Sequence, residues 1–223
     1  MSDTDSFIDE VTEEVRRDRL FLMLRRYGWI GAVVVVAIVG GTALREINRS
    51  KVETASQALG DSMIAAVDAE NADARAAALA AVETETLDRQ MVLDMARAGA
   101  LVDAGNTDEA VVLLQSIGSN GDLPEIYRHI ASFKSLILQS ESLGIEERRL
   151  QFDALAAPNA PLRHLAQEQL ALLDIEAGDT SAAIARLQAL VADATSRHEM
   201  RDRANQLIVA LGGEVAPQPA HGG

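Results

Sequence analysis

The sequence contains no cysteine and few aromatic residues, and both absences narrow what the protein can be. Without cysteine, the chain alone forms no disulfide, no cysteine-ligated zinc site, no iron–sulfur cluster and no cysteine nucleophile. Aromatic residues make up only 3% of the 223 residues and there are 5 prolines, whereas Ala, Leu and Glu are abundant. Helix-forming residues dominate such a composition, which predicts an all-α fold.

The chain also lacks the positive charge that binding to nucleic acid requires. Its formal net charge is −14, and residues 1–51 hold eight Lys and Arg against eight Asp and Glu. All of the net negative charge therefore lies in residues 52–223. Because this charge would repel the phosphate backbone, we expect no nucleic-acid partner.

One hydrophobic run, residues 27–44, contains no charged residue. As a helix rising about 1.5 Å per residue, it would be about 27 Å long, which is within the range for a membrane span. Tyr27 and Trp29 suit the headgroup zone at one end, and Arg25 and Arg26 precede them as a charged stop. The run predicts a single transmembrane helix that anchors the chain.

The charges beside this run predict its orientation. Five arginines precede it and three basic residues follow it, which favours a cytoplasmic N-terminus and a periplasmic domain over residues 45–211. Residues 1–26 are predicted to be a cytoplasmic tail with a short amphipathic helix. Two alternatives stay open: a secretory signal cleaved after Gly41-Thr42-Ala43, or a buried core helix. The long acidic segment before the run argues against the signal.

Beyond the run, apolar residues follow helical spacing and one turn pattern occurs twice. Residues Ala104–Ala110 read Ala-Gly-Asn-Thr-Asp-Glu-Ala, and Ala177–Ala183 read Ala-Gly-Asp-Thr-Ser-Ala-Ala. Gly105 and Gly178 suit the left-handed conformation that ends a helix. Each segment thus predicts a helix end, a turn and the start of an antiparallel helix.

The residues after each glycine predict how the second helix begins and packs. Asn106 and Asp179 offer side-chain oxygens that can cap it, and the small side chains of Ala110 and Ala183 allow close approach of its partner.

A third turn at Gly144 lies 39 residues after the first glycine and 34 before the second, and about 34 residues is the tetratricopeptide period. This middle unit is degenerate, because charged residues 146–149 replace the small residue, although Leu150, Phe152 and Leu155 are still predicted to face inward. Three imperfect helical hairpins are therefore expected. Hairpins of this kind stack and leave a concave surface for peptides or partner helices. A non-repetitive helical bundle is the alternative.

The last helix is predicted near His198–Leu211, followed by a disordered tail over residues 212–223, which is rich in Gly and Pro.

The order of these parts resembles the bacterial ancillary subunit of the SecYEG translocon, a single-span protein with a tetratricopeptide-like domain. Residues 7–11 and 25–29 look like the version carried by alphaproteobacteria, and 18 Arg against 2 Lys fits a GC-rich genome. The resemblance implies an inner-membrane protein whose helical domain faces the periplasm and assists secreted chains together with periplasmic chaperones. The partners implied are the translocon, chaperones or secreted chains.

No pattern predicts a catalytic residue, a cofactor or a metal. The four histidines, His129, His164, His198 and His221, lie on separate segments without metal-ligand spacing. Residues 118–121 read Gly-Ser-Asn-Gly but lack the lysine of a phosphate loop, so we expect a linker. We therefore expect a non-enzymatic binding module. An envelope scaffold for cell division or outer-membrane assembly is the alternative function, and a membrane-tethered hydrolase would need a pocket of convergent polar groups.

Overall fold

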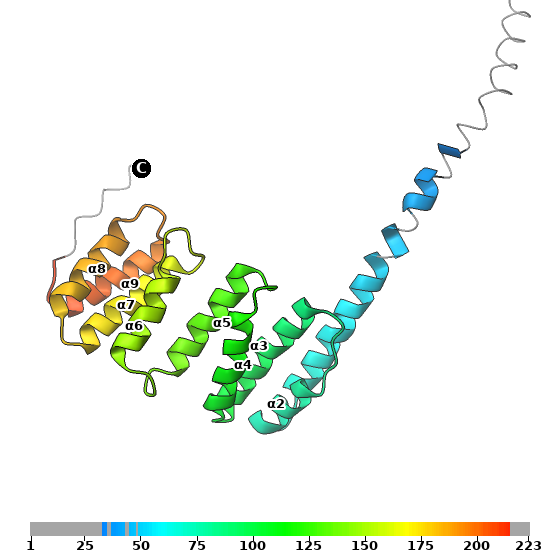
Figure 1. The fold of residues 1–223 in the computed structure, drawn as a ribbon, viewed down its shortest axis with the longest axis horizontal. Helices are drawn as coiled ribbons and strands as arrows, with labels where there is room; N and C mark the ends of the chain where they lie inside the picture. Colours follow the sequence, from blue (N-terminus) through cyan, green and yellow to red (C-terminus); the bar gives the residue numbers. More distant parts are fainter. Residues whose placement is uncertain (1–32, 35–36, 43–44, 48, 215–223) are drawn as a thin grey trace, which may run out of the picture. The chain divides into compact units, whose positions relative to one another are not determined.

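The computed structural model describes residues 33–34, 37–42, 45–47 and 49–214, and these residues form helices and turns with no strand (Figure 1). The predicted all-α class is thus confirmed for the described residues. Residues 49–67 are helical, and the following helices are α2 (Ala72–Ala80), α3 (Leu87–Asp103), α4 (Thr107–Ser119), α5 (Glu125–Leu138), α6 (Ile145–Leu155), α7 (Arg163–Glu176), α8 (Thr180–Ala192) and α9 (His198–Ala210).

The chain divides into two compact units, Met1–Gly60 and Asp61–Gly223. In the first unit, the described residues before position 48 are helical, and their apolar side chains are exposed. None of the helices in the described part of the chain has the length and apolar character needed to cross a membrane. Only residues 33–34 and 37–42 of the predicted span belong to that part. The proposed anchor residues Arg25, Arg26, Tyr27 and Trp29 lie outside the described residues, as does the tail 1–26.

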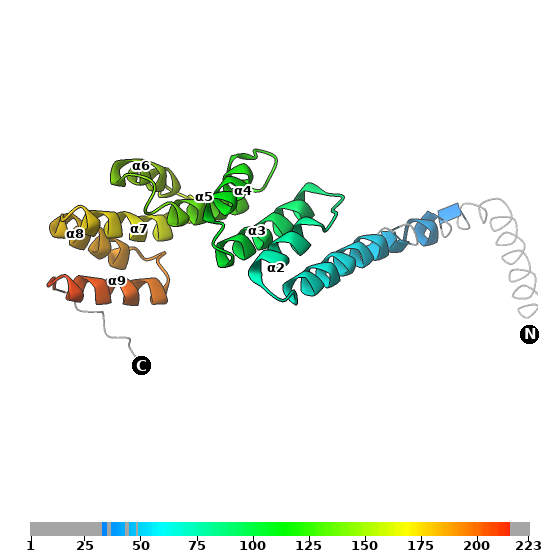
Figure 2. The ribbon, with the colours of Figure 1, turned by 90° about the horizontal axis from the view of Figure 1, so that it is seen from below.

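In the second unit, each helix packs mainly against the helices next to it in sequence (Figures 1 and 2). The neighbours α3 and α4 form one hairpin, and α7 and α8 form another. Helices α5 and α6 pack less closely than the other neighbouring pairs. The second unit is therefore a series of helical hairpins.

Three core clusters hold this series together. The first joins residues 63 and 66 with α2, α3, α4 and the middle of α5, where Ala131 is fully buried. The second joins the end of α5 with α6 and α7, around Phe152 and Leu170. The third joins α7, α8 and α9, around Leu187 and Ile208. Because α5 and α7 each contribute to two clusters, they connect the hairpins into one unit.

Three helices end at a glycine with positive φ. Gly105, Gly178 and Gly212 end α3, α7 and α9 with φ of +81°, +81° and +78°. At each, the glycine N–H and the N–H of the next residue donate to carbonyls of the last turn, as in Asp179 N to Asp174 O at 2.9 Å. These are Schellman ends, in which a left-handed glycine satisfies carbonyls that the helix leaves free. The spacing of Gly178 and Gly212 equals one tetratricopeptide period.

The two predicted helix caps after these turns differ. Asp179 caps α8, since its side chain accepts a hydrogen bond from Ala182 N at 2.9 Å. Asn106 makes no such bond at the start of α4. Its amide instead donates to Asp73 Oδ1 at 3.2 Å, so the expected cap at Asn106 is wrong because α2 offers a carboxylate nearby.

Small side chains lie where helices approach closely. Ala110 and Ala183 have 0% exposed surface in α4 and α8. Gly118 lies within α4, and a Cβ there would come 2.5 Å from Ser132 Oγ of α5. The expectation that residues 118–121 form a plain linker therefore fails at Gly118, whose missing side chain lets α4 and α5 pack closely.

The degenerate middle unit differs from its neighbours in its turn. Gly144 precedes α6 as its N-cap, with φ of −63°, and therefore does not form a left-handed end. Phe152 and Leu155 are buried as predicted, but Leu150 is 72% exposed. Leu150 lies two residues from Phe152, and positions two apart on a helix point in different directions. The predicted inward orientation of Leu150 is wrong.

The charged residues of this unit contact α7. Arg148 of α6 pairs with Glu176 at 2.5 Å, and Arg149 pairs with Asp174 at 2.5 Å. The side chain of Asp174 is 4% exposed and also accepts from Arg186 Nε of α8 at 3.0 Å. Burial raises the pKa of Asp174, but the two arginines outweigh burial and hold this pKa below its ordinary value. One carboxylate thus joins three consecutive helices.

The first residues of the tail predicted at 212–223 belong to the end of α9. Gly213 lies against Ile208 and Ile184, and the carbonyl of Glu214 accepts from Gln188 Nε2 at 3.3 Å. Residues 215–223 lie outside the described part of the chain.

Candidate functional site

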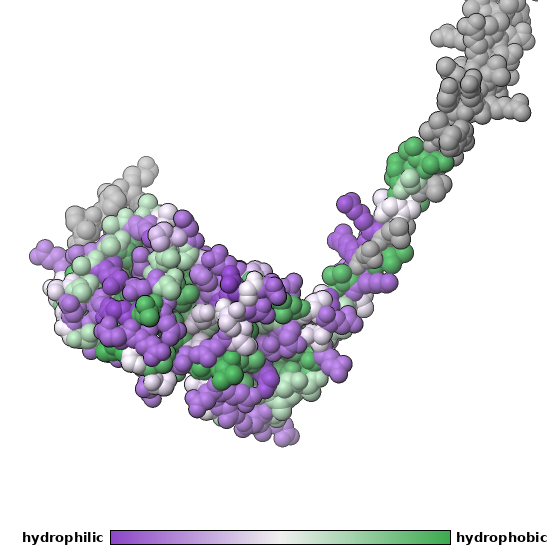
Figure 3. Space-filling view, in the orientation of Figure 1, coloured by the Kyte–Doolittle hydropathy of each residue, from purple (hydrophilic) through white to green (hydrophobic). Residues whose placement is uncertain are grey.

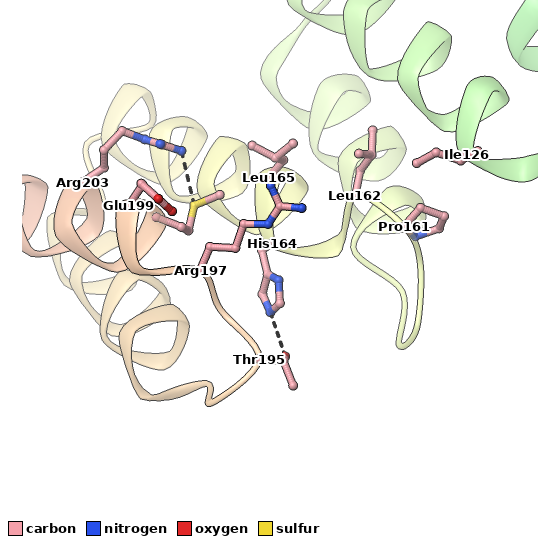
Figure 4. A pocket seen from close by; sticks show the side chains of 10 residues that line it. Ile126, Pro161, Leu162, His164, Leu165, Thr195, Arg197, Glu199 and Arg203 are labelled. Atoms are coloured by element: carbon pink, nitrogen blue, oxygen red, sulfur yellow. Dashed lines mark hydrogen bonds between the residues drawn. The ribbon is translucent and has the colours of Figure 1, made fainter.

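A cavity of about 640 Å³ lies where α5, α7 and α9 begin (Figure 4). We call it the α5–α7–α9 cavity, and its lining residues come from these three helices and from the loops before α7 and α9. They are Ile126, Pro161, Leu162, His164, Leu165, Thr195, Arg197, Glu199, Met200 and Arg203. Half of them are apolar and half are polar, and its volume falls within the range of ligand sites in proteins, about 300–1,000 Å³.

The three helices present their first turns to this cavity. Ile126 lies in the first turn of α5, Leu165 in that of α7 and Glu199 in that of α9. None of the three helices has a side-chain cap, whereas α2, α3 and α8 do. The first N–H groups of a helix lack partners within it, and its N-terminal end carries partial positive charge. The cavity is thus bordered by three helix N-terminal ends, of which α5 and α9 carry the acidic residues Glu125 and Glu199 in their first turns.

Two of the lining residues stand at equivalent positions of their helices. Val92 in α3, Leu165 in α7 and Glu199 in α9 stand at the same position relative to the left-handed glycine that ends each helix, and all three are exposed. Two helical turns later, Gly99, Leu172 and Gln206 are also exposed. Equivalent positions on α3, α7 and α9 are thus exposed, and two of them, Leu165 and Glu199, line the cavity.

One acidic side chain holds the loop before α9 against the start of α7. Asp193 accepts hydrogen bonds from Thr195 N at 2.8 Å and Thr195 Oγ1 at 2.6 Å, and it pairs with Arg163. His164 Nε2 lies 3.2 Å from Asp193 Oδ2. It also lies 3.3 Å from Thr195 Oγ1, and Figure 4 draws this contact as a dashed line. The Thr195 hydroxyl and N–H, with Arg163 and His164, hold the pKa of Asp193 well below its ordinary value. This wall of the cavity therefore has defined geometry.

The arginines of the lining differ in whether they are neutralised. Arg203 donates from Nε and from its second amino group to the two oxygens of Glu168, both at 2.9 Å. That hydrogen bonding raises the pKa of Arg203. Arg197 is exposed and forms no ion pair or side-chain hydrogen bond with any described residue. Glu199 likewise forms no ion pair or hydrogen bond in the described part of the chain, but its charge helps to raise the pKa of Arg203. Arg197 is thus the lining arginine that is not neutralised.

The turn and packing residues singled out in the sequence do not line this cavity, whereas His164, one of the four histidines, does. Gly105, Ala110, Gly144, Gly178 and Ala183 build turns and helix contacts, and none of them lines it. Sequence reasoning missed the cavity because its residues come from three helices, joined only by folding. The sequence does hold one indication of the cavity. Leu165 and Glu199 lie at the same distance along the chain before Gly178 and Gly212, the glycines that end their helices.

The lining residues provide apolar surface and hydrogen-bonding groups, and their hydroxyl group is already hydrogen-bonded. This hydroxyl, that of Thr195, is bonded to Asp193. Within the described residues, no group of three or more His, Asp or Glu side chains is placed to hold a metal ion. Of the four histidines, His129 and His198 lie beside Glu125 and Asp202 one turn away on their own helices, and His221 is outside the described part.

The surface of the second unit is mainly hydrophilic on the face shown in Figure 3, with apolar residues scattered among polar ones. Large apolar side chains exposed at or beside the cavity are Ile126, Tyr127 and Leu165, at 39%, 41% and 36%. The cavity therefore combines accessible apolar surface with hydrogen-bond donors. Comparisons with protein-family models, curated proteins and solved structures found no match to this chain.

Proposed function

We propose that this chain is a non-enzymatic protein-interaction module that holds partner segments on the exposed face of its helical hairpins. The observation that carries the proposal is the α5–α7–α9 cavity, which opens on equivalent exposed positions of successive hairpins. Stacked helical hairpins expose continuous faces that suit extended peptides or partner helices. A lining of apolar side chains with a few polar groups is the composition of a binding site.

The spacing of the helix ends supports the interpretation of the second unit as tetratricopeptide-like. Gly178 and Gly212 end equivalent helices, and their spacing equals the tetratricopeptide period. The middle unit, with its charged α6 and its Gly144 turn, departs from that pattern. The tetratricopeptide-like interpretation therefore rests on α7, α8 and α9, which hold the two glycines one period apart.

We also propose that the N-terminal run anchors the module in the bacterial inner membrane. Val33, Val34, Ile38 and Val39 are 50–60% exposed in the first unit. Adjacent exposed β-branched side chains are unfavourable in water and favourable in lipid. The five-to-three arginine and lysine asymmetry favours a cytoplasmic N-terminus and a periplasmic helical domain. Together with the resemblance to the ancillary translocon subunit, these features favour a role beside the SecYEG translocon. The partners would be the translocon, periplasmic chaperones and secreted chains.

Site-specific crosslinking tests the binding role. A photoreactive phenylalanine analogue replaces Leu165 in the cavity, or Leu150 of α6 as an exposed control outside it, in the full chain in its native membranes. We expect Leu165 to capture translocon subunits, chaperones or secreted chains, and Leu150 to capture few. Equal capture at the two positions, or none at Leu165, would refute the proposal that partners bind at the α5–α7–α9 cavity. Capture of division or outer-membrane assembly proteins would favour the scaffold alternative.

The absence of cysteine makes a direct test of topology possible. Leu150→Cys places the only thiol of the chain at a position that is 72% exposed. A membrane-impermeant maleimide should label this thiol in cells whose outer membrane alone has been permeabilised. Labelling only after the inner membrane is opened would show a cytoplasmic domain and refute the proposed orientation.

A further inference from the structure

Arg197 is the cation that the α5–α7–α9 cavity leaves available to a ligand. It is the N-cap residue of α9, and its side chain is exposed. The other cations of this region are neutralised, Arg203 by Glu168 and Arg163 by Asp193. A guanidinium without an ion pair in a partly apolar cavity is well suited to a carboxylate, with which it can form two parallel hydrogen bonds.

The helix starts around Arg197 favour the same charge. Helices α5, α7 and α9 begin at the cavity with Pro124, Leu162 and Arg197 as their N-cap residues, and none of these supplies a capping oxygen. Their partial positive charges add to that of Arg197, and the first-turn carboxylates Glu125 of α5 and Glu199 of α9 offset part of this charge. An anionic group of a ligand is therefore favoured at this end of the hairpins.

Two features limit how much negative charge the ligand can carry. Glu199 lines the same cavity and would repel a carboxylate placed near it. The chain beyond residue 51 carries the whole net charge of −14, so a long acidic segment would be repelled outside the cavity. Apolar surface at Ile126 and Leu165 instead favours apolar side chains beside the carboxylate.

We propose that the cavity binds an extended partner segment in which a single Asp or Glu is flanked by apolar residues, with Arg197 pairing with that carboxylate. This inference rests on the proposed binding function and adds the chemical class of its partner. Because apolar residues stand on both sides of the Asp or Glu in this segment, the charged group is an internal side chain of the segment rather than its terminus.

Peptide binding to the full chain in nanodiscs of zwitterionic lipid tests the proposal. The probe is an acetylated and amidated dodecapeptide of alternating Ser and Leu, with one central Glu and an uncharged fluorophore. Matched peptides carry Gln at the centre, or Glu at six positions, or a central Gln with a free C-terminus. We expect the single-Glu peptide to bind about five- to tenfold more tightly than its Gln counterpart, which is about the upper end of the contribution of an exposed ion pair.

Variants of the protein separate the roles of the cavity residues. Arg197→Gln should weaken binding of the single-Glu peptide to the level of the Gln peptide, and Glu199→Gln should strengthen it about two- to threefold by removing repulsion. Arg201→Gln, on the same helix but outside the lining, is the matched control and should change neither affinity. Unchanged melting curves for the three variants show that the fold is intact.

Each remaining outcome decides between the two proposals. If the Glu and Gln peptides bind equally and Arg197→Gln has no effect, Arg197 does not recognise a carboxylate. The proposal that the cavity binds partner segments would then still stand. Tighter binding of the six-Glu peptide overturns the requirement for apolar flanks, and tighter binding of the free C-terminus overturns the internal carboxylate. Absence of all peptide binding while Leu165 still crosslinks to partners refutes this inference alone. Absence of both peptide binding and crosslinks refutes the proposed function itself.

Discussion

The carboxylate of Asp174 predicts the largest single charge effect on the stability of the second unit. Its two oxygens accept from Arg149 of α6 and Arg186 of α8, at 2.5 and 3.0 Å, and its side chain is 4% exposed. Asp174→Asn keeps the shape but removes the charge, which leaves two guanidinium groups facing a neutral amide. Removing one partner of a fully buried ion pair costs about 3–5 kcal/mol.

The expected loss is smaller than that range because the arginines are partly hydrated. The side chains of Arg149 and Arg186 are 24% and 33% exposed, so both can turn toward water when the carboxylate is gone. We therefore expect Asp174→Asn to lower the free energy of unfolding by about 2–3 kcal/mol. For a chain of this size that corresponds to a fall in Tm of about 4–12 °C.

Circular dichroism at 222 nm, in thermal and urea melts of the full chain, measures this loss. Asp103→Asn is the matched control, because Asp103 pairs with Arg75 but is 62% exposed, and an exposed pair contributes about 0–1 kcal/mol. If Asp174→Asn and Asp103→Asn melt within about 2 °C of the unchanged protein, the ion pairs of Asp174 do not hold α6, α7 and α8 together, and the reasoning is wrong.

The pH dependence of the same variant gives an independent check. The pKa of Asp174 is held below its ordinary value of 3.8 in the folded chain, so the folded state favours the ionised carboxylate. This contribution is fully present above the unfolded pKa of about 3.9, and it is lost as the pH falls through the lower folded pKa. The stability difference between the unchanged protein and Asp174→Asn should therefore shrink below about pH 4. A difference that grows on acidification would contradict the assignment.

Two further substitutions test the glycines that the fold requires, again by thermal melts. Gly178→Ala forces a left-handed φ on a residue with a Cβ and should cost about 1–2 kcal/mol, whereas Gly144→Ala, at a φ of −63°, should change stability by less than about 0.5 kcal/mol. Gly118→Ala brings a Cβ 2.5 Å from Ser132 Oγ and should lower the free energy of unfolding by about 1–3 kcal/mol. Adding Ser132→Ala should restore most of that stability. If it restores none, another contact limits the approach of α4 to α5.

The turns were the part of the fold that the sequence predicted best, for a physical reason. The conformation at Gly105 and Gly178 depends on the local chain, because only a residue without Cβ enters the left-handed region at little cost. Both glycines have φ of +81°. The cap at Asn106 depends instead on a neighbour in space, Asp73 of α2, which no pattern around Asn106 can reveal.

The same distinction separates the buried apolar residues of α6 from its ion pairs. Phe152 and Leu155 are buried in α6, as their apolar character predicts, but the four charged residues before them were read only as a departure from the repeat. In the structure, Arg148 and Arg149 pair with carboxylates of α7. The partners are 28 and 25 residues away along the chain, so their pairing follows from the fold and not from local spacing.

The packing between α5 and α6 affects the geometry of the α5–α7–α9 cavity. Helix α6 contacts α7 more closely than it contacts α5, so the joint between α5 and α6 is the least packed in the second unit. The cavity crosses this joint, since Ile126 belongs to α5 and the remaining lining belongs to the helices and loops after α6. The second core cluster bridges it through an edge-to-face contact between Phe133 and Phe152, whose ring centroids lie 5.7 Å apart. The position of Ile126 relative to Arg197 therefore depends on packing between aromatic rings, while the α7 and α9 walls depend on Asp193 and its hydrogen bonds.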